Sequence, residues 1–574
     1  MSAAAQDPVV PAVGGVTSRV AVGTRAGLRL LAWAPAVLVP LVFLGFFFAW
    51  PAATLVARGF VGEDGALDTG AFHEVFTRAR TWRIIGLTLG MAAAATTVSV
   101  LLGVPGAHVL YRCRFPGRSV ARAAVAVPFV LPTVVVGVAF RSLLVPGGWL
   151  EDLHLDGTVW AVLAAMVFFN YSLVVRGVGS VWSRLDPRMV QAARALGATP
   201  TRAFLTVTLP ALLPAIASAA SVVFLFCATA FGIVLILGGV ELATIESEIY
   251  LLTTAYLDLR GAAVLSVVQV LVIAAALWAA GQARRRSERA LALRSDAVEH
   301  PLGAADAPAA ALTALVVFGL LAAPLAQLLW RSFHRKGQFT LANWAGLADA
   351  HLSRAIRVSA LEAAWNSMVV ATQAAAIALI VGTLVALVVT RPTRTPRARR
   401  ALAVLDSVFM LPLGVSAVTV GFGFLITLNA PPLDMRGSAL LVPVAQAVVA
   451  VPLVVRMVAP VLRAIDPRQR EAAATLGAGP LRVIATIDGA HLVRAGAVAI
   501  GFAFATSLGE FGATSFLSRP DAPTLPVMIY RLVSRPDAAE QGVAVAASVL
   551  LALIAATLMV LVEKGRPSTA GEFQ

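Results

Sequence analysis

Long apolar segments separated by short polar ones run through most of the chain. A helix that crosses a bilayer needs about 20 mainly apolar residues. Segments of this kind cover residues 30–54, 84–107, 119–145, 157–179, 211–238, 262–281, 310–330, 363–390, 401–428, 438–460, 493–517 and 540–562. The pattern predicts an all-α polytopic membrane protein with about 12 transmembrane helices.

The composition supports this interpretation. Of the 574 residues, 59% are hydrophobic and 13% are charged, whereas a soluble domain has roughly 45–50% apolar and about 25% charged residues. A single soluble core cannot absorb that excess, because cores stop growing near ~250–300 residues. The formal net charge is +15, but no basic stretch carries interleaved aromatic residues, so we expect a lipid bilayer and not nucleic acid as the partner of these charges.

Arginine-rich loops indicate the orientation. They lie at residues 19–29, 112–122, 284–289 and 391–400. With twelve spans, all of these loops fall on one side, which the positive-inside rule makes cytoplasmic. Acidic loops at residues 151–156 and 241–248 fall on the other side. We therefore expect a multi-pass protein of the cell membrane with both termini in the cytoplasm.

The chain contains an internal repeat. Residues 185–200 and 465–480 are identical at nine of sixteen positions, at an offset of 280. The same offset aligns Leu131-Pro132 with Leu411-Pro412 and Phe231-Gly232 with Phe511-Gly512. The expected organisation is a cytoplasmic tail at 1–27, a six-span repeat at 28–282, a cytoplasmic linker at 283–309, a second six-span repeat at 310–563 and a tail at 564–574. Because each repeat has an even number of spans, the two repeats are parallel, related by an axis along the membrane normal.

The most similar segment is too polar to cross the membrane. In each copy an Asp-Pro pair is typical of a helix start, a later glycine of a left-handed helix end, and a further proline of a second helix. These residues are Asp186-Pro187, Gly197 and Pro200 in the first copy and Asp466-Pro467, Gly477 and Pro480 in the second. The pattern predicts a short helix, a tight turn and another helix on the cytoplasmic face.

This segment resembles the E-A-A-x3-G-x9-I-x-L-P loop of the permease subunits of binding-protein-dependent ABC importers. The matching residues are Glu471, Ala472, Ala473, Gly477 and Ile487 in the second copy and Gln191, Ala192, Ala193, Gly197, Leu209 and Pro210 in the first. The departures are Gln191 in place of the glutamate, and Gly489 and Ala490 in place of the final Leu-Pro, which puts an equal role for the two copies in doubt. The resemblance implies that these loops couple the permease to an ATPase.

The same resemblance implies the partners. The chain has only two lysines, Lys336 and Lys564, and neither lies in a phosphate-binding Gly-Lys-Ser/Thr loop. We therefore expect a non-catalytic subunit that works with two copies of a separate ABC ATPase and with an extracytoplasmic solute-binding protein. The resemblance favours the fused thiamine permeases, with ferric-iron permeases as the alternative substrate class.

Glu510 is the acid that the hydropathy pattern places inside a span, and intramembrane acids are functional candidates by default. We expect it to line the pathway of a cationic substrate, or else to lie near the outer end of its span and bond to a neighbouring helix. Its counterpart is Ala230. For most of the other polar residues within spans, interhelical hydrogen bonds are the expected role. They are Asn170, Gln269, Gln373 and Gln446.

Other classes of protein remain open at this point. A secondary transporter also has twelve spans in two halves, but it would carry more intramembrane charges and no paired loop of this kind. A membrane enzyme needs a convergent cluster of His, Asp and Glu, which the sequence does not indicate. Cys113 and Cys227 have no metal-ligand spacing and the histidines are scattered. We therefore expect no metal site, no catalytic residue and no cofactor in this chain.

Overall fold

The computed structural model describes residues 34–61, 66, 68, 70–239, 241–287, 299–350, 357–391, 395–428, 434–435 and 437–564. The two predicted tails therefore lie outside it, except for Lys564. The predicted loop arginines Arg19, Arg25, Arg29, Arg289 and Arg394 also lie outside the described residues.

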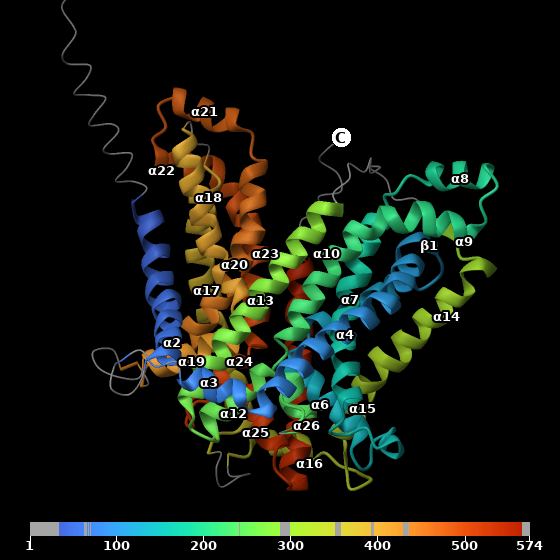
Figure 1. Ribbon diagram of the computed structural model, residues 1–574, viewed down its shortest axis with the longest axis vertical. Helices are drawn as coiled ribbons and strands as arrows, with labels where there is room; N and C mark the ends of the chain where they lie inside the picture. Colours follow the sequence, from blue (N-terminus) through green and yellow to red (C-terminus); the bar gives the residue numbers. More distant parts are fainter. Residues whose placement is uncertain are drawn as a thin grey trace, which may run out of the picture.

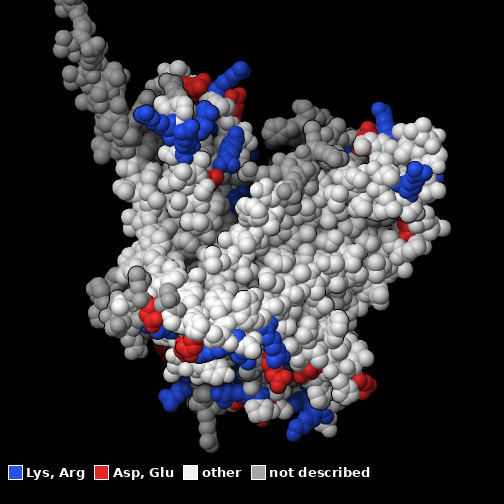
Figure 2. Space-filling model, in the orientation of Figure 1, with Lys and Arg blue, Asp and Glu red and all other residues white. Residues whose placement is uncertain are grey.

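Among the described residues, ten helices are long and apolar enough to cross a membrane. They are Ala34–Phe60, Ala79–Arg112 (α4), Val159–Trp182 (α7), Pro200–Ala228 (α9 to α10), Leu259–Ala279 (within α13), Ala304–Ser332 (η4 to α15), Ala360–Val389 (α17), Leu441–Ala464 (α20), Leu481–Leu508 (to the end of α23) and Ala538–Val562 (within α26). The predicted all-α, multi-spanning class is confirmed. Figure 2 shows the charged side chains gathered toward two ends of the molecule, with a broad face of other residues between them.

Two of the predicted spans are broken helices. Segment 119–145 consists of α5 (Arg118–Val130) and α6 (Thr133–Leu144), which meet at an angle of 107°. Segment 401–428 consists of α18 (Pro396–Met410), the 3-10 turn η7 (Leu411–Gly414) and α19 (Ala417–Thr427). The aligned prolines explain both breaks, because Pro132 pushes Leu131 into an extended conformation with ψ of 136° and Pro412 lies in the 3-10 turn. Twelve continuous spanning helices are therefore not confirmed: the part of the chain that the structure describes has ten, or eleven if the α5–α6 pair is one span.

Two other predicted spans have different limits. Segments 211–238 and 493–517 begin earlier, at Pro200 and Leu481, and end at Ala228 and Leu508. The remainder of each forms a separate short helix, α11 (Gly232–Leu237) or α24 (Gly512–Leu517). Each long helix also contains a π-helical segment at the same offset of 280, η3 (Phe204–Thr208) and η8 (Ile484–Asp488). The repeat is thus conserved down to local backbone irregularities.

The remaining elements include the segments that make up the long helices and the short elements that connect them. The first part of the chain contributes η1 (Gly45–Ala49), α2 (Trp50–Phe60), α3 (Gly70–Thr77), β1 (Cys113–Arg114), η2 (Glu151–Leu153), α8 (Pro187–Ala195), α9 (Pro200–Ala203), α10 (Leu209–Ala228), α12 (Ile245–Thr254) and α13 (Leu259–Ser287). The second part contributes β2 (His300–Pro301), η4 (Ala304–Asp306), α14 (Ala307–Leu315), η5 (Val316–Ala322), α15 (Ala323–Ser332), β3 (His334–Arg335), β4 (Gln338–Phe339), α16 (Ala342–Ala345), η6 (Gly346–Ala348), α21 (Pro467–Thr475), α22 (Pro480–Val483), α23 (Gly489–Leu508), α25 (Leu525–Val533) and α26 (Ala538–Lys564).

Figure 1 shows α8 and α21 at two separate corners of one end of the molecule, and α3, α12, α16 and α25 at the opposite end. We call these the loop end and the α12/α25 end. The strands are short: β1 pairs with β2 in parallel, and β3 pairs with β4 antiparallel.

Small residues let equivalent helices approach closely in both repeats. A Cβ atom added to Gly103 of α4 would lie 2.6 Å from Val174 Cγ1 of α7. One added to Gly382 of α17 would lie 2.7 Å from Val454 Cγ1 of α20. Neither space admits a larger residue without movement. Such close contacts are the usual basis of helix packing in membranes.

Candidate functional site

A cavity of about 410 Å³ lies between the two repeats. Equivalent elements of both repeats line it: the breaks at Pro132 and Pro412, and the ends of α10 and α23. Its other lining residues include Phe129, Met166, Phe169, Asn170, Phe226, Thr229, Phe231, Gly232, Glu246, Ser416, Phe502, Thr506, Glu510, Phe511 and Gly512. The Leu-Pro and Phe-Gly pairs that recur at the offset of 280 therefore lie at the same cavity.

Aromatic rings from both repeats meet beside this cavity. Phe231 and Phe511, which are equivalent residues, stack with ring centroids 5.2 Å apart and an interplanar angle of 19°. Tyr250 packs against Phe231 at 5.4 Å, and its equivalent Tyr530 packs against Phe511 at the same distance. The sequence comparison aligned the two phenylalanines but did not predict that they touch.

Gly232 makes the aromatic stack possible. A Cβ atom at this position would lie 2.8 Å from Thr133 Oγ1 and 3.2 Å from Phe511 Cδ1. A side chain here would therefore clash with Thr133 of the same repeat and crowd Phe511 of the other.

Glu510 lies in the break between α23 and α24, two residues beyond the end of the long helix at Leu508, and it lines the cavity. Its carboxylate accepts hydrogen bonds from the backbone N–H groups of Ala513 (2.7 Å) and Thr514 (3.1 Å) and from Thr514 Oγ1 (2.5 Å). Thr514 Oγ1 also accepts from Gln446 Nε2 at 3.0 Å. The buried side chain thus caps the start of α24, which is a structural role that the sequence did not suggest.

Glu246 is a second acid at the cavity, and it comes from the first repeat. The sequence placed it in an exposed acidic loop, but it lies in α12 and is fully buried. Its Oε1 accepts a hydrogen bond from Gln269 Nε2 at 2.8 Å. Burial raises the pKa of Glu246 to about 8, while hydrogen bonds from Ser416 of the second repeat and from Gln269 oppose that rise. At neutral pH this carboxyl is therefore mainly protonated.

The two acids make the cavity asymmetric. At the offset of 280, Ala230 stands opposite Glu510 and Pro526 stands opposite Glu246. Each repeat therefore contributes one carboxyl group from a position that the other repeat does not use.

The other polar residues predicted within spans mostly form hydrogen bonds between helices. Asn170 Nδ2 of α7 donates to Cys227 Sγ of α10 at 3.3 Å. Gln269 Nε2 of α13 donates to the carbonyl oxygen of Ala228 at 3.0 Å as well as to Glu246, and Gln446 of α20 reaches Thr514 of α24. The expectation of interhelical bonding is confirmed for these three residues.

The two predicted loop helices have the expected local structure. The carboxylates of Asp186 and Asp466 accept from the backbone N–H two residues on, at 3.0 and 2.9 Å, and so cap α8 and α21. Gly197 and Gly477 adopt left-handed conformations, with φ of 86° and 83°. In each loop the residue after the glycine donates its N–H to the carbonyl five residues back, which completes a Schellman turn.

The loops project outward and lie apart from each other (Figure 1). No residue of α8 or α21 is buried, and Gln191 and Glu471 are exposed at equivalent positions. Leu196 and Leu476, which follow the two helices at equivalent positions, are each 89% exposed. No sequence motif singles out these leucines, although the same apolar residue follows both polar helices. Two identical exposed apolar side chains are a reasonable contact point for a partner.

Comparison with known proteins identifies the class of protein. Residues 86–288 match the family described as "binding-protein-dependent transport system inner membrane component". The matched residues cover most of the first repeat, and the multi-spanning fold agrees with a transport permease.

The relatives that cover most of the chain are more specific. The chain is 25% identical to the thiamine transport system permease protein ThiP of Salmonella typhimurium over 509 residues, which are 86% of this chain and 91% of that protein. For ThiP of Brucella abortus the identity is 23% over 545 residues, 92% of this chain and 95% of the relative. The sulfate transport system permease protein CysT of Escherichia coli is 34% identical, but only over 29% of this chain and 63% of its own length.

Among solved structures, a bacterial ABC transporter involved in the import of the acidic polysaccharide alginate matches 47% of this chain and 100% of its own, with a TM-score of 0.41 and 16% identity.

Proposed function

We propose that this permease passes thiamine through the cavity between its two repeats, and that a separate ATPase bound to α8 and α21 drives the transport. The observation that carries the substrate is the match to thiamine permeases over most of both chains. The cavity supports it, because thiamine is an aromatic cation. A permanent positive charge suits the carboxylate of Glu510, and flat rings suit the Phe231–Phe511 pair.

The loop helices support a docking site for the ATPase. Neither helix contains a buried residue, each is followed by an exposed leucine, and both lie at the same end as the arginine-rich loops. The positive-inside rule makes that end cytoplasmic. Because the loops occupy separate corners, each would take one copy of the ATPase (Figure 1). A solute-binding protein would then deliver the substrate at the α12/α25 end, and both termini would lie in the cytoplasm.

Uptake of labelled thiamine by the reconstituted complex tests this function. The chain is purified together with the ATPase and the binding protein that adjacent genes encode, and the complex is placed in liposomes that contain ATP. We expect uptake that needs all three components and that unlabelled thiamine, but not a ferric complex, competes away. Competition by the ferric complex alone would assign the permease to iron. Uptake without the ATPase would indicate a secondary transporter.

A matched pair of variants tests the docking role. Glu471→Ala removes the charge of the second loop, so we expect weaker ATPase association and a lower rate of substrate-stimulated hydrolysis. Gln191→Ala changes the equivalent position of the first loop, which has no charge to lose, and should have a smaller effect. Equal behaviour of Glu471→Ala and the unmodified chain in both assays would remove Glu471 from the docking contact.

A further inference from the structure

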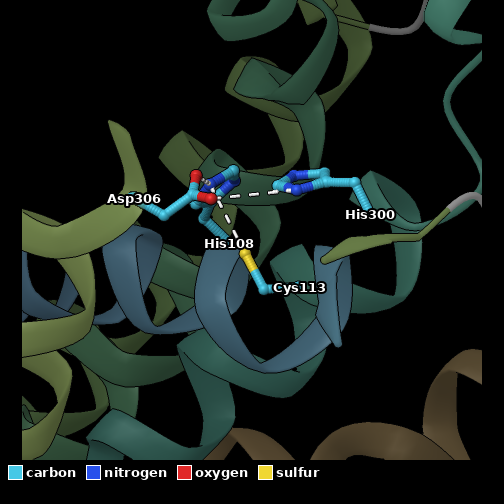
Figure 3. A group of neighbouring side chains, drawn as sticks. All are labelled: His108, Cys113, His300 and Asp306. Atoms are coloured by element: carbon cyan, nitrogen blue, oxygen red, sulfur yellow. Dashed lines mark hydrogen bonds and ion pairs between the residues drawn. The ribbon is translucent and has the colours of Figure 1, made fainter. Parts of the chain in front are cut away.

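Four side chains with metal-ligand atoms meet near the loop end of the first repeat (Figure 3). They are His108 in the last turn of α4, Cys113 in β1, His300 in β2 and Asp306 at the end of η4. One ligand atom from each lies within 4.8 Å of the others. Nearly 190 residues separate Cys113 from His300, so no spacing in the sequence could reveal the group.

The distances are close to those of a tetrahedral site. His108 Nε2 lies 2.8 Å from Asp306 Oδ1 and 3.9 Å from Cys113 Sγ, and His300 Nδ1 lies 3.8 Å from Asp306 Oδ2. Zinc bonds of about 2.0–2.3 Å place the ligand atoms of a tetrahedron roughly 3.3–3.8 Å apart. Small side-chain rotations therefore suffice to surround one ion.

The backbone holds the two halves of the group together. β1 and β2 form a parallel pair in which Cys113 is in register with His300. The N–H of Leu302 donates to the carbonyl oxygen of Arg114 at 3.2 Å, and Arg118 forms an ion pair with Glu299 at 2.8 Å. The end of the inter-repeat linker therefore lies against the turn between α4 and α5, and an ion bound there would strengthen an existing contact.

A simple hydrogen bond between His108 and Asp306 explains less of this arrangement than a metal site does. It gives no reason for a fully buried thiol to face the same carboxylate. A second imidazole also lies there, although its Nδ1 contacts the carbonyl oxygen of Pro301 at 3.0 Å as well. Nδ1 of His108 is buried and has no hydrogen-bond partner among the described residues. All the polar contacts found for this ring therefore point into the group.

We propose that His108, Cys113, His300 and Asp306 bind one Zn²⁺ ion that fastens the inter-repeat linker to the first repeat. Two imidazoles, a thiolate and a carboxylate are ligands that zinc accepts, and four protein ligands are typical of a structural site and not of a catalytic one. The site differs from the translocation cavity and does not depend on the proposed substrate.

Metal analysis of the full chain tests the proposal. The protein is purified without a histidine tag, equilibrated with Zn²⁺, passed through a desalting column and analysed for zinc by mass spectrometry. We expect one zinc ion per chain in the wild type. Cys113→Ser and His300→Ala should each lose most of this zinc. Cys227→Ser is the matched control, because that cysteine is also buried but lies in α10 beside Asn170.

Cobalt substitution gives a second readout. Co²⁺ in the proposed site should show a thiolate-to-cobalt charge-transfer band that is absent in Cys113→Ser and present in Cys227→Ser. If Cys113→Ser fails to fold, His300→Ala decides the question, since the His300 side chain is 40% exposed and its loss leaves no large buried space. Absence of zinc from the wild-type chain, or equal zinc in the wild type and both ligand variants, would overturn the proposal.

Discussion

The helices α8 and α21 have the same caps and the same turn, but they rest on different supports. Beneath α21, the fully buried carboxylate of Asp488 forms ion pairs with Arg391, which follows α17, and with Arg470 of α21 itself. Arg470 Nε donates to Asp488 Oδ1 at 2.8 Å, and its Nη2 donates to the carbonyl oxygen of Leu462 at 3.0 Å. These bonds fix the second loop helix to two long helices.

The first repeat has no equivalent of this network. Tyr111, Val190 and Thr208 stand at the positions of Arg391, Arg470 and Asp488. Val190 and Thr208 instead line a cavity of about 270 Å³ under α8, together with Trp182 and Phe204. The repeat has therefore preserved the shape of the loop while its attachment to the bundle has diverged.

The difference predicts unequal rigidity. A buried, doubly paired carboxylate resists separation, whereas a helix over a cavity has fewer contacts to lose. We expect the α21 loop to transmit force to the second repeat more directly than the α8 loop does to the first.

The largest effect is expected from removing the charge of Asp488. Asp488→Asn keeps the volume but leaves two partly buried guanidinium groups facing a neutral amide. Breaking a buried ion pair in this way costs about 3–5 kcal/mol. We expect a marked fall in the melting temperature of the purified chain, or loss of folded protein from the membrane.

Thr208→Val is the matched control at the equivalent position of the first repeat. No charge is lost there, so its melting temperature should stay close to that of the unmodified chain. If both variants had the same melting temperature, the proposed difference between the two supports would be wrong.

A smaller and local effect is expected at the loop glycines. Gly477→Pro cannot adopt the left-handed φ of 83° and also loses the N–H that donates to Ala474. Gly477→Ala keeps the N–H and has open space around its Cβ, so only backbone strain of roughly 1–2 kcal/mol remains. Coupled ATP hydrolysis should therefore fall strongly in Gly477→Pro and modestly in Gly477→Ala, with membrane insertion unchanged in both.

The same pair of changes at Gly197 tests the comparison between the repeats. If the stiffer second support matters for coupling, Gly197→Pro should reduce coupled hydrolysis less than Gly477→Pro does. A larger loss for the first loop would reverse that order and contradict the assigned difference in rigidity.

The sequence predicted the features that depend on neighbouring residues. Asp186, Asp466, Gly197 and Gly477 specify caps and turns through their own backbone, and the constant offset fixed the repeat. The prediction of spans from hydropathy failed where apolar residues continue across a break. Residues 119–145 were predicted as one span, although Pro132 bends the chain there. Pro132 did indicate a break in the helix, but the length of the apolar segment favoured a single span.

The parts of the site formed by long-range contacts were not predictable. Glu246 lies in a polar segment that reads as an exposed loop, and only packing of α12 against both repeats buries it. Asp488 was not singled out at all, because its partners lie 18 and 97 residues away in the chain. Burial of charge is a property of the assembled bundle, and single-sequence patterns do not contain it.

At the cavity, Glu510→Gln removes a charge that the equivalent residue of the first repeat, Ala230, does not have. The carboxylate accepts three hydrogen bonds, from Ala513 and Thr514. The NH₂ group of glutamine would therefore face at least one of these donors instead of accepting from it. We therefore expect a modest loss of thermal stability together with reduced thiamine uptake. Uptake that falls only in proportion to the amount of folded protein would leave Glu510 as a cap of α24 and remove it from the substrate route.

The effect expected from Glu246→Gln depends on pH. Because burial raises the pKa of Glu246 from an ordinary value of 4.5 to about 8, the native protein holds this proton more tightly than the unfolded chain does. The stabilising contribution of the protonated group is complete below about pH 4.5 and is lost as the pH rises toward 8.

Glutamine mimics the neutral form, so the variant should lack this pH dependence. Melting temperatures of the wild type and Glu246→Gln should nearly coincide at pH 5 and separate by pH 9, with the wild type the less stable of the two. Glu241→Gln, at an exposed position five residues earlier, should follow the wild-type curve. Parallel curves for the wild type and Glu246→Gln across this range would show that Glu246 is already ionised at neutral pH. An ionised carboxylate from the first repeat would then line the cavity, and the first repeat would attract a cationic substrate directly.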